Sequence, residues 1–177
     1  MRPLPSATIL FSLFHFPFYL FHCHFFMRAV IQRVSEASVA VDGQIVGAIG
    51  PGLLLFVGVE AADTDEDIQW LANKLPTLRV FEDADERVNL SLADTGGQIL
   101  LISQFTLFGS LRKGTRPSFN RAAPPEQAKE LLARLHGALE AALGKQVPQG
   151  IFGAMMDIRA ANDGPVTLII DTKQKDF

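Results

Sequence analysis

Cysteine and histidine are scarce in this chain of 177 residues, and most of what it has lies at the N-terminus. The one cysteine is Cys23, and three of the four histidines also lie within residues 1–26. Residues 27–177 therefore contain no cysteine and a single histidine, His136. These absences exclude disulfides, thiolate chemistry, Cys/His zinc sites and a Ser-His-Asp triad from that part of the chain. Catalysis there would depend on hydroxyls, carboxylates and backbone donors, which suits a substrate that brings its own reactive group.

Residues 1–26 also differ from the rest in aromatic content, since they hold seven of the fourteen phenylalanines and the only tyrosine. The apolar run from Ile9 to Phe26 has the ~18 residues of a minimal membrane span and resembles the apolar part of a signal peptide. Three histidines interrupt it, however, and no small-x-small cleavage site follows. We interpret residues 1–26 as an apolar extension from a start codon placed too far upstream, and we expect the folded protein to begin at Met27. A signal or a membrane anchor is the alternative.

Residues 27–177 have the length of one domain and can bury a core without disulfides or metal. They carry 15 basic and 19 acidic side chains, because Arg2 is the only charged residue of the extension. We expect a cytoplasmic protein with no membrane partner. An acidic protein that binds a polyanion must also gather its cations locally.

Apolar periodicity predicts a sheet that starts with a hairpin. The runs from Arg28 to Val41 and from Gln44 to Ile49 flank Asp42-Gly43, which is a strong two-residue turn signal. The continuous apolar run from Leu53 to Val59 indicates a strand that is buried on both faces. Further strands are expected at Leu78 to Phe81, Arg87 to Leu90, Gln98 to Phe108 and Val166 to Ile170.

Two main helices are predicted between these strands. Thr64 and Asp67 have capping-box spacing ahead of a helical apolar stripe that should end at Pro76. A longer amphipathic helix should open at Pro124-Pro125 and end at Gly144. Helices and hairpin-linked strands together predict an α+β single domain with a curved, barrel-like mixed sheet.

Two polar motifs lie where apolar runs meet turns, at Ser103 to Leu107 and at Asn162 to Thr167. A packed scaffold can hold polar groups against a ligand at such positions. Together with Met27 to Val34 and Lys113 to Phe119, these motifs resemble the D-aminoacyl-tRNA deacylase family in the expected order. The resemblance spans nearly all of Met27 to Asp171 and leaves the extension out.

The resemblance implies a proofreading hydrolase of translation that is a homodimer with active sites at the subunit interface and needs no metal or cofactor. Its substrate would be aminoacyl-tRNA, whose ester between a D-amino acid, or a mischarged glycine, and the terminal ribose is cleaved. In that family the peptide corresponding to Gly164-Pro165 is cis and enters the active site of the opposite subunit. Its backbone would obstruct an L side chain there and leave room for a D side chain or for glycine.

The family likeness places the catalytic residues in the first motif, at Ser103, Gln104, Phe105 and Thr106. Backbone N–H groups around Phe105 and Thr106 could point at the ester oxyanion. Neither motif has a histidine or lysine that could activate the hydroxyl of Thr106, so we do not expect this residue to be the nucleophile. The resemblance instead assigns the assisting group to the 2′-OH of the substrate's terminal ribose.

Other substrate contacts are also implied by the resemblance. Arg33 should lie beside Gly164-Pro165 and donate to its carbonyls. Phe152, Gly153 and Met156 resemble the segment that lines the pocket of the 3′-terminal adenosine, with core packing as the alternative for Phe152 and Met156. Met155 and Pro76 depart from the family pattern, because an acidic residue and an apolar residue are expected there.

A basic loop from Leu111 to Arg121 stands out in this acidic chain. Its residues Arg112, Lys113 and Arg116 are expected to contact phosphates at the acceptor end of tRNA, although a solvated loop is the alternative. Two rival functions also stay open. One is a paralogous deacylase that removes L-alanine from mischarged tRNA, and the other is a non-catalytic RNA-binding module.

Overall fold

The computed structural model describes residues 27–174, so the extension at residues 1–26 lies outside the described residues. The chain forms, in order, β1 (Arg28–Val41), β2 (Gln44–Ile49), β3 (Gly52–Gly58), α1 (Asp65–Thr77), β4 (Arg79–Glu82), β5 (Val88–Ser91), α2 (Leu92–Thr95), β6 (Gln98–Ser103), the 3-10 helix η1 (Phe105–Phe108), α3 (Pro125–Leu143) and β7 (Asp157–Asp171). Among these described helices, none has the length and apolar character needed to cross a membrane.

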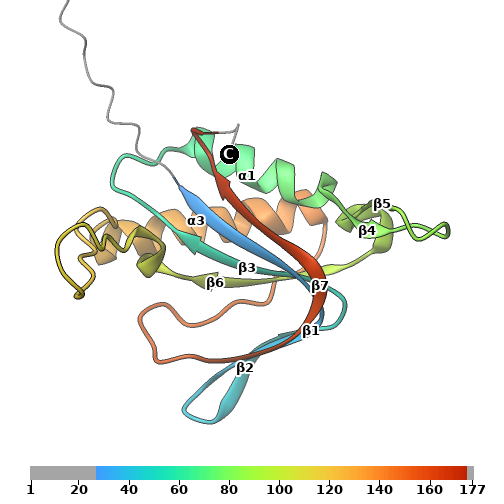
Figure 1. The fold of residues 1–177 in the computed structure, drawn as a ribbon, viewed down its shortest axis with the longest axis horizontal. Helices are drawn as coiled ribbons and strands as arrows, with labels where there is room; N and C mark the ends of the chain where they lie inside the picture. The colour runs from blue at the N-terminus through green and yellow to red at the C-terminus, as the bar shows by residue number, and fades with distance from the viewer. Residues whose placement is uncertain (1–26, 175–177) are drawn as a thin grey trace, which may run out of the picture.

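The strands form a strongly curled mixed sheet around β1 (Figure 1). Strand β7 pairs along almost the whole of β1, while β3 and then β2 follow each other along its other edge. These pairs are antiparallel, whereas β6 joins the far edge of β3 in parallel. A separate two-stranded sheet is formed by β4 and β5. The prediction of an α+β domain with a curved mixed sheet is therefore confirmed.

The opening hairpin follows from its turn residues. Asp42 and Gly43 both have positive φ, at 49° and 78°, which suits the two central residues of a tight hairpin turn. The turn sets Val41 opposite Gln44, and the alternating side chains of β1 then reach opposite faces of the sheet. The predicted hairpin is confirmed.

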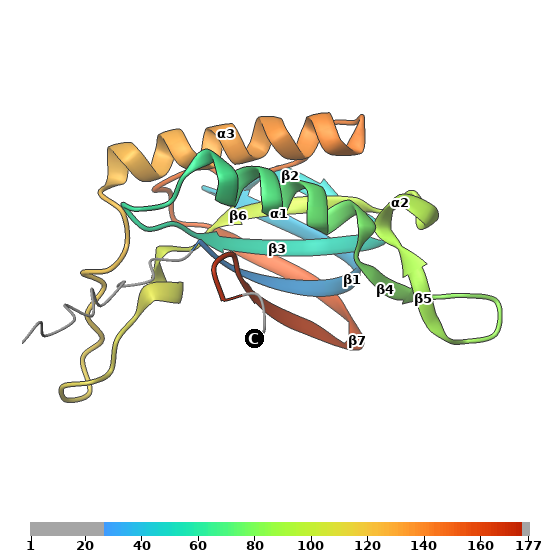
Figure 2. The same cartoon turned by 90° about the horizontal axis from the view of Figure 1, so that it is seen from above.

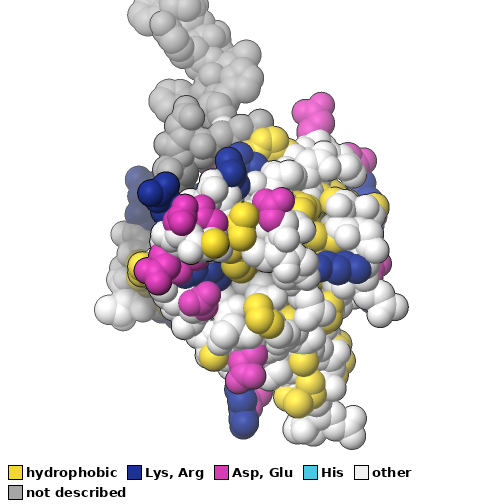
Figure 3. Space-filling view, turned by 90° about the vertical axis from the view of Figure 1, so that its right-hand side faces the viewer, with side chains coloured by type: hydrophobic (Ala, Val, Ile, Leu, Met, Phe, Trp, Pro, Cys, Tyr) yellow, Lys and Arg dark blue, Asp and Glu magenta, His cyan; other side chains and the backbone are white. Residues whose placement is uncertain are grey.

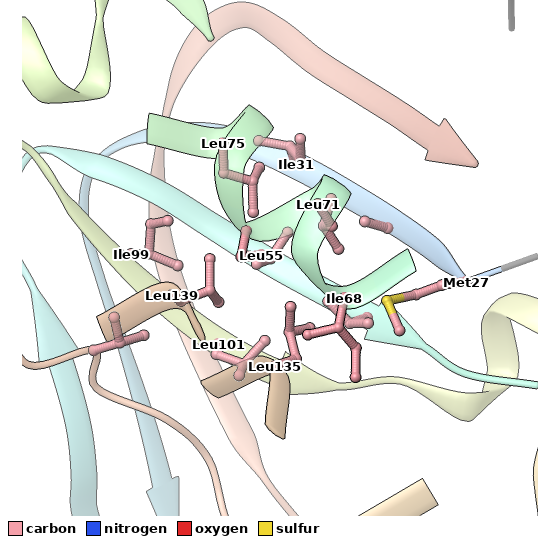
Figure 4. Packing of buried hydrophobic residues seen from close by; sticks show 14 of the residues in the cluster. Met27, Ile31, Leu55, Ile68, Leu71, Leu75, Ile99, Leu101, Leu135 and Leu139 are labelled. Atoms are coloured by element: carbon pink, nitrogen blue, oxygen red, sulfur yellow. The ribbon is translucent and has the colours of Figure 1, made fainter. Parts of the chain in front are cut away.

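The main core lies between the sheet and the helices α1 and α3, which cover the same face (Figure 2). Strand β3 contributes Leu53 and Leu55 to this core, while Leu54 faces a second cluster on the other side of the sheet. Burial on both faces explains why β3 is continuously apolar. Figure 4 shows how the helices meet the strands, with Ile68, Leu71, Leu75, Leu135 and Leu139 packed against Ile31, Leu55, Ile99 and Leu101.

Helix boundaries agree with the sequence except at three places. The capping box is present, since the carboxylate of Asp67 accepts the backbone N–H of Thr64 at 2.9 Å. Pro76 does not end α1 as predicted but lies buried in its last turn, and the helix continues to Thr77. The proline costs one helical hydrogen bond, because its nitrogen has no N–H for the carbonyl of Ala72, and its ring is buried. The short helices α2 and η1 were not predicted.

Strand β7 is much longer than the predicted Val166 to Ile170. It begins at Asp157 and includes the whole motif from Asn162 to Thr167. Pairing with β1 outweighs the poor strand propensity of Asn, Asp, Gly and Pro in this motif. The expectation that the motif precedes the last strand is therefore wrong, because the motif lies inside it.

Candidate active site

The first motif lies where β6 leaves the sheet and turns into η1. The backbone N–H of Gln104 donates to the carbonyl of Val57 at 2.7 Å, which ties the turn to β3. Gly58 makes this close approach possible, because a Cβ on it would stand only 2.8 Å from the carbonyl oxygen of Gln104 and 2.9 Å from the ring of Phe108. Phe108 is buried while Phe105 is 58% exposed, so η1 is anchored at its end and open at its start.

The chemistry available at η1 is that of backbone donors and weak polar side chains. The side-chain amide nitrogen of Gln104, Nε2, donates a hydrogen bond to the hydroxyl oxygen of Thr106. An amide cannot accept the proton of a hydroxyl nucleophile, so this contact does not activate Thr106. The first N–H groups of a helix have no acceptor within the helix, which leaves those of Phe105 and Thr106 suited to an oxyanion. Ser103 is half-buried at the end of β6.

The second motif forms a bulge in β7. Gln32 pairs with Thr167 and Val34 pairs with Asn162, so the four residues 163–166 face only one residue of β1. Proline has no N–H to give to the sheet, which favours such an irregularity at Pro165. The peptide between Gly164 and Pro165 is cis, as the resemblance implied, and both residues are exposed.

The β1 residue that faces this bulge is Arg33, which is only 3% exposed. Its Nε donates to the carbonyl of Asp163 at 3.1 Å, and its Nη2 lies 3.4 Å from the carbonyl oxygen of Gly164. Nε is also 3.0 Å from the Asp163 carboxylate, while Nη1 donates to the carbonyl of Val80 at 2.6 Å and Nη2 lies 3.5 Å from Glu82. Arg33 thus joins the bulge to the β4 strand through five polar contacts.

The two motifs do not meet within one chain. Arg28 of β1 donates to the carbonyl of Leu107 in η1 at 2.9 Å, whereas Arg33 holds the bulge. These two arginines are five residues apart on β1, which is roughly 17 Å along a strand, and their odd spacing turns them to opposite faces. Figure 1 accordingly shows the segment that follows β6 at one side of the molecule and the bend of β7 at the other.

A cavity of about 240 Å³ lies between α3 and the segment before β7. Two predicted site residues, Ser103 and Phe152, line it together with Leu101, Gln149 and Gly150 and, from α3, Lys129, Leu132, Ala133 and His136. The α3 residues are spaced by three or four, which places them on one helix face. Sequence reasoning missed Lys129 and His136 because only the tertiary fold brings α3 beside Ser103.

The remaining residues of the predicted adenosine segment lie outside the lining of this cavity. Gly153 has φ +78°, which suits glycine, and Met156 packs against the second core cluster. Met155 is 90% exposed. His136 of α3 is half-buried, with its Nε2 at 2.8 Å from the carbonyl oxygen of Val147. It therefore helps to hold the start of the segment that leads to Phe152.

The basic loop projects from the body of the protein next to η1 (Figure 2). Arg112, Lys113 and Arg116 are all exposed, and the bridge between Ser110 and Ser118 closes the loop around them. Arg121 behaves differently, because its guanidinium pairs at 2.7 Å with Glu60, which is fully buried. The exposed cations are thus positioned beside η1 and away from the β7 bulge.

A buried carboxyl lies near the same end of the sheet. Burial raises the pKa of Asp63 to about 7, against an opposing hydrogen bond from the backbone of Glu60. Asp67 lies four residues further along the chain, where hydrogen bonds from Thr172 and Thr64 outweigh the effect of burial and lower its pKa. Within residues 27–174 no group of acidic, histidine or cysteine side chains has the arrangement of a metal site.

Comparison with known proteins gives consistent matches. The family model described as D-Tyr-tRNA(Tyr) deacylase matches residues 30–171. The D-aminoacyl-tRNA deacylase of Opitutus terrae is 55% identical over 150 residues, which are 85% of this chain and 100% of that protein. The protein of the same name from Bacillus velezensis is 51% identical over 84% of this chain and 100% of its own length.

Solved structures show the same fold. One described as c-Myc DNA Unwinding Element Binding Protein has a TM-score of 0.77 and 38% identity, covering 81% of this chain and 97% of its own. Another, from a structural analysis of a probable eukaryotic D-amino acid tRNA deacylase, has a TM-score of 0.73 at 19% identity, with 82% and 99% covered. Because the family model covers most of the chain and the relatives are about half identical over their whole length, this chain belongs to the D-aminoacyl-tRNA deacylase family.

Proposed function

We propose that the protein is a homodimer that hydrolyses D-aminoacyl-tRNA and glycine mischarged on tRNA, and that it spares L-aminoacyl-tRNA. Each active site would combine η1 of one subunit with the Gly164-Pro165 bulge of the other. Membership in the deacylase family supports the reaction. The proposed substrate belongs to translation, so the proposal places the protein in the cytoplasm.

The observation that carries this proposal is the separation of the two motifs within one chain. η1 and the bulge are exposed, yet the contacts that hold them lie roughly 17 Å apart on opposite faces of β1. A single chain therefore cannot bring both motifs to one ester. A second copy related by two-fold symmetry can, because each copy then offers its bulge to the η1 turn of the other.

The stereochemical filter would follow from this geometry. The bulge presents the backbone of Gly164 and the ring of Pro165 as a wall that Arg33 anchors from behind. A fixed backbone surface excludes an L side chain that points into it. A D side chain points away from that surface, and glycine has no side chain that could clash. Rejection by steric conflict needs no favourable contact with the D side chain.

The chemistry would be shared between backbone donors and the substrate. The N–H groups of Phe105 and Thr106 would stabilise the oxyanion of the tetrahedral intermediate. The 2′-OH of the terminal ribose would assist the reaction, because the hydroxyl of Thr106 contacts an amide donor and has no base beside it. No metal or cofactor takes part in this scheme.

The rest of the substrate would lie on the η1 side of the molecule. The cavity of about 240 Å³ lined by Phe152 and Ser103 would receive the terminal adenosine, whose base can stack on the exposed aromatic ring. Gly153 and Met156 would support this segment from outside the cavity. Arg112, Lys113 and Arg116 would contact phosphates of the acceptor end.

Deacylation rates on three substrates test the reaction and its filter. D-Tyr-tRNA and Gly-tRNA should be hydrolysed, and L-Tyr-tRNA should react at least about a hundredfold more slowly, because each ~1.36 kcal/mol of steric conflict is a factor of ten. Equal rates on D- and L-Tyr-tRNA would contradict the filter. Preferential release of L-alanine from mischarged tRNA would favour the paralogous activity, and binding without hydrolysis would favour an RNA-binding module.

Mixing two variants tests whether the site is shared between subunits. Gly164→Leu should fold, since a Cβ at this position meets only the Asn162 amide at 3.5 Å, but it should block the pocket of its partner. Phe105→Pro removes one proposed oxyanion donor at the first position of η1, where proline fits, and Phe105→Ala controls for loss of the ring.

Each inactive variant alone has no complete site. After subunit exchange in a 1:1 mixture, about a quarter of the wild-type activity should return. No recovery in demonstrated heterodimers would place both motifs in one subunit.

A further inference from the structure

The end of η1 is surrounded by charged side chains that the proposed chemistry does not use. Phe108, the last residue of η1, is 2% exposed. The guanidinium of Arg28 lies 5.4 Å from the centroid of its ring, and that of Arg121 lies 5.6 Å from it. An aromatic ring attracts a cation over its face, and the attraction grows as both leave water. Two arginines from distant parts of the sequence therefore converge on the residue that anchors η1.

Each arginine is itself held in place by a buried carboxylate. Arg28 donates to the carbonyl of Leu107 at 2.9 Å and lies 3.5 Å from Asp171, which is 1% exposed. Arg121 pairs at 2.7 Å with Glu60, which is fully buried. A buried carboxylate keeps its cation in place, because loss of the cation would leave its charge uncompensated.

Arg121 also marks the point where the basic loop rejoins the body. The backbones of Glu60 and Ala122 form an isolated antiparallel β-bridge, and the N–H of Ala123 donates to the carbonyl of Val59 at 2.9 Å. Earlier in the same loop, Phe119 packs edge-on against Phe105 with the ring centroids 5.1 Å apart. The loop therefore contacts both the first and the last residue of η1.

We propose that Arg121 is a positioning residue of the deacylation site, which acts with Arg28 through Phe108 to fix the orientation of η1. The side chain does not touch the ester in this scheme. It keeps the backbone N–H groups at the start of η1 in the geometry that the oxyanion needs, where a small displacement costs much of the rate. It thereby gives the basic loop a second role beside phosphate contact. This inference rests on the proposed function for its kinetic readout.

Arg121→Lys is the variant that isolates the role of the guanidinium. Lysine keeps a positive charge beside Glu60 but lacks the planar group that lies over the ring of Phe108. Arg134→Lys on α3 is a matched control, because Arg134 is 43% exposed against 47% for Arg121 and also forms a 2.7 Å ion pair, with Asp65. Arg134 contacts neither η1 nor the basic loop in any described interaction.

The expected result for Arg121→Lys is a fall of about tenfold in kcat on D-Tyr-tRNA with KM changed less than about twofold, since positioning acts on the transition state. Amides of residues 105–109 should exchange hydrogen several-fold faster, because the turn opens more often. Arg134→Lys should leave both measurements unchanged. If Arg121→Lys fails to fold, Arg28→Lys provides the same two readouts from the other side of the network.

Two results would overturn the proposal. A rise in KM with kcat unchanged would make Arg121 a phosphate contact, and unchanged kcat and amide exchange would give it no role at η1. The two readouts also separate this inference from the proposed function. If the wild-type protein does not hydrolyse D-Tyr-tRNA, the proposed function fails, while the exchange of residues 105–109 still decides whether Arg121 holds the turn.

Discussion

The two motifs of the candidate site are held by different kinds of interaction. η1 rests on close packing, because Gly58 leaves just enough room for the carbonyl of Gln104 and the ring of Phe108, and because Arg28 and Arg121 lie over that ring. The bulge around Gly164 instead depends on the polar contacts of Arg33. Close packing fixes atoms to a fraction of an ångström and suits backbone donors. The bulge is exposed and is supported by one buried side chain, that of Arg33. Such an arrangement suits a rigid surface that would contact another subunit.

The charges around the two motifs differ as well. The loop of residues 111–121 beside η1 has only basic side chains among its charged residues. The face shown in Figure 3, on the side of Figure 1 where β4, β5 and the bend of β7 lie, mixes acidic, basic and hydrophobic side chains. A polyanion is attracted to the first surface more than to the second. Under the proposed function, the tRNA backbone would therefore lie on the η1 side, and the bulge would be left for contact with the second subunit.

The largest expected effect tests the chemistry assigned to η1. A D-Tyr-tRNA whose terminal ribose lacks the 2′-OH should be hydrolysed at least about a hundredfold more slowly, because the assisting group is then missing. Thr106→Ala should keep its rate on the normal substrate within about fivefold, since its hydroxyl has no base to activate it. Single-turnover rates on both substrates measure this contrast. Trapping an acyl-threonine adduct by mass spectrometry would reverse the assignment.

The next effect tests the bulge. Arg33→Lys should lower kcat/KM for D-Tyr-tRNA by about tenfold or more, because an ammonium cannot bond the carbonyls of Asp163, Gly164 and Val80 together. Arg79→Lys is the control, since Arg79 also donates to a backbone carbonyl, that of Asn89, but on an exposed strand. If both variants keep full activity and the preference for D over L, the bulge does not depend on Arg33.

Local patterns in the sequence predicted the packed region well. The Asp42-Gly43 turn and the apolar spacing of α1 and α3 depend on contacts close in sequence, so the hairpin and both main helices were predicted. The four-residue α2 was missed, although Ser91 and Asp94 have capping-box spacing, because four residues give no apolar period. Patterns between residues close in sequence therefore predicted most of the helical structure.

The bulge and the cavity could not be predicted in this way. The motif around Gly164 is a poor strand in isolation, and only its pairing with β1 makes it part of β7. The register that leaves residues 163–166 opposite a single residue is likewise a property of two paired strands. Lys129 and His136 line the cavity because α3 packs beside Ser103, which no local pattern encodes. Long-range pairing decided what local propensity could not.

A smaller effect tests the buried carboxyl on the η1 side. Burial raises the pKa of Asp63 to about 7, above the ~3.9 of an unfolded chain, so the folding stability that is present below about pH 4 is lost progressively as the pH rises from about 4 to about 7. Asp63→Asn removes this ionisation and can keep the bond that its Oδ2 accepts from the N–H of Glu60. Thermal unfolding should show a gain on the order of 5 °C at pH 8 and a smaller gain at pH 5. An equal gain at both values would mean that ionisation of Asp63 plays no part.

The smallest expected effect concerns the start of β1, which supports η1 through Arg28. Met27 is fully buried in the core, and its carbonyl accepts the N–H of Thr172 at 3.1 Å, so this residue is part of the described fold. A chain that begins at Met27 should therefore match the full chain in melting temperature to about 1 °C and in deacylation rate to about twofold. Side-by-side melting, size-exclusion and kinetic measurements check this. Loss of folding on truncation, or recovery of residues 1–26 in a membrane fraction attached to the native protein, would show that the extension has a role of its own.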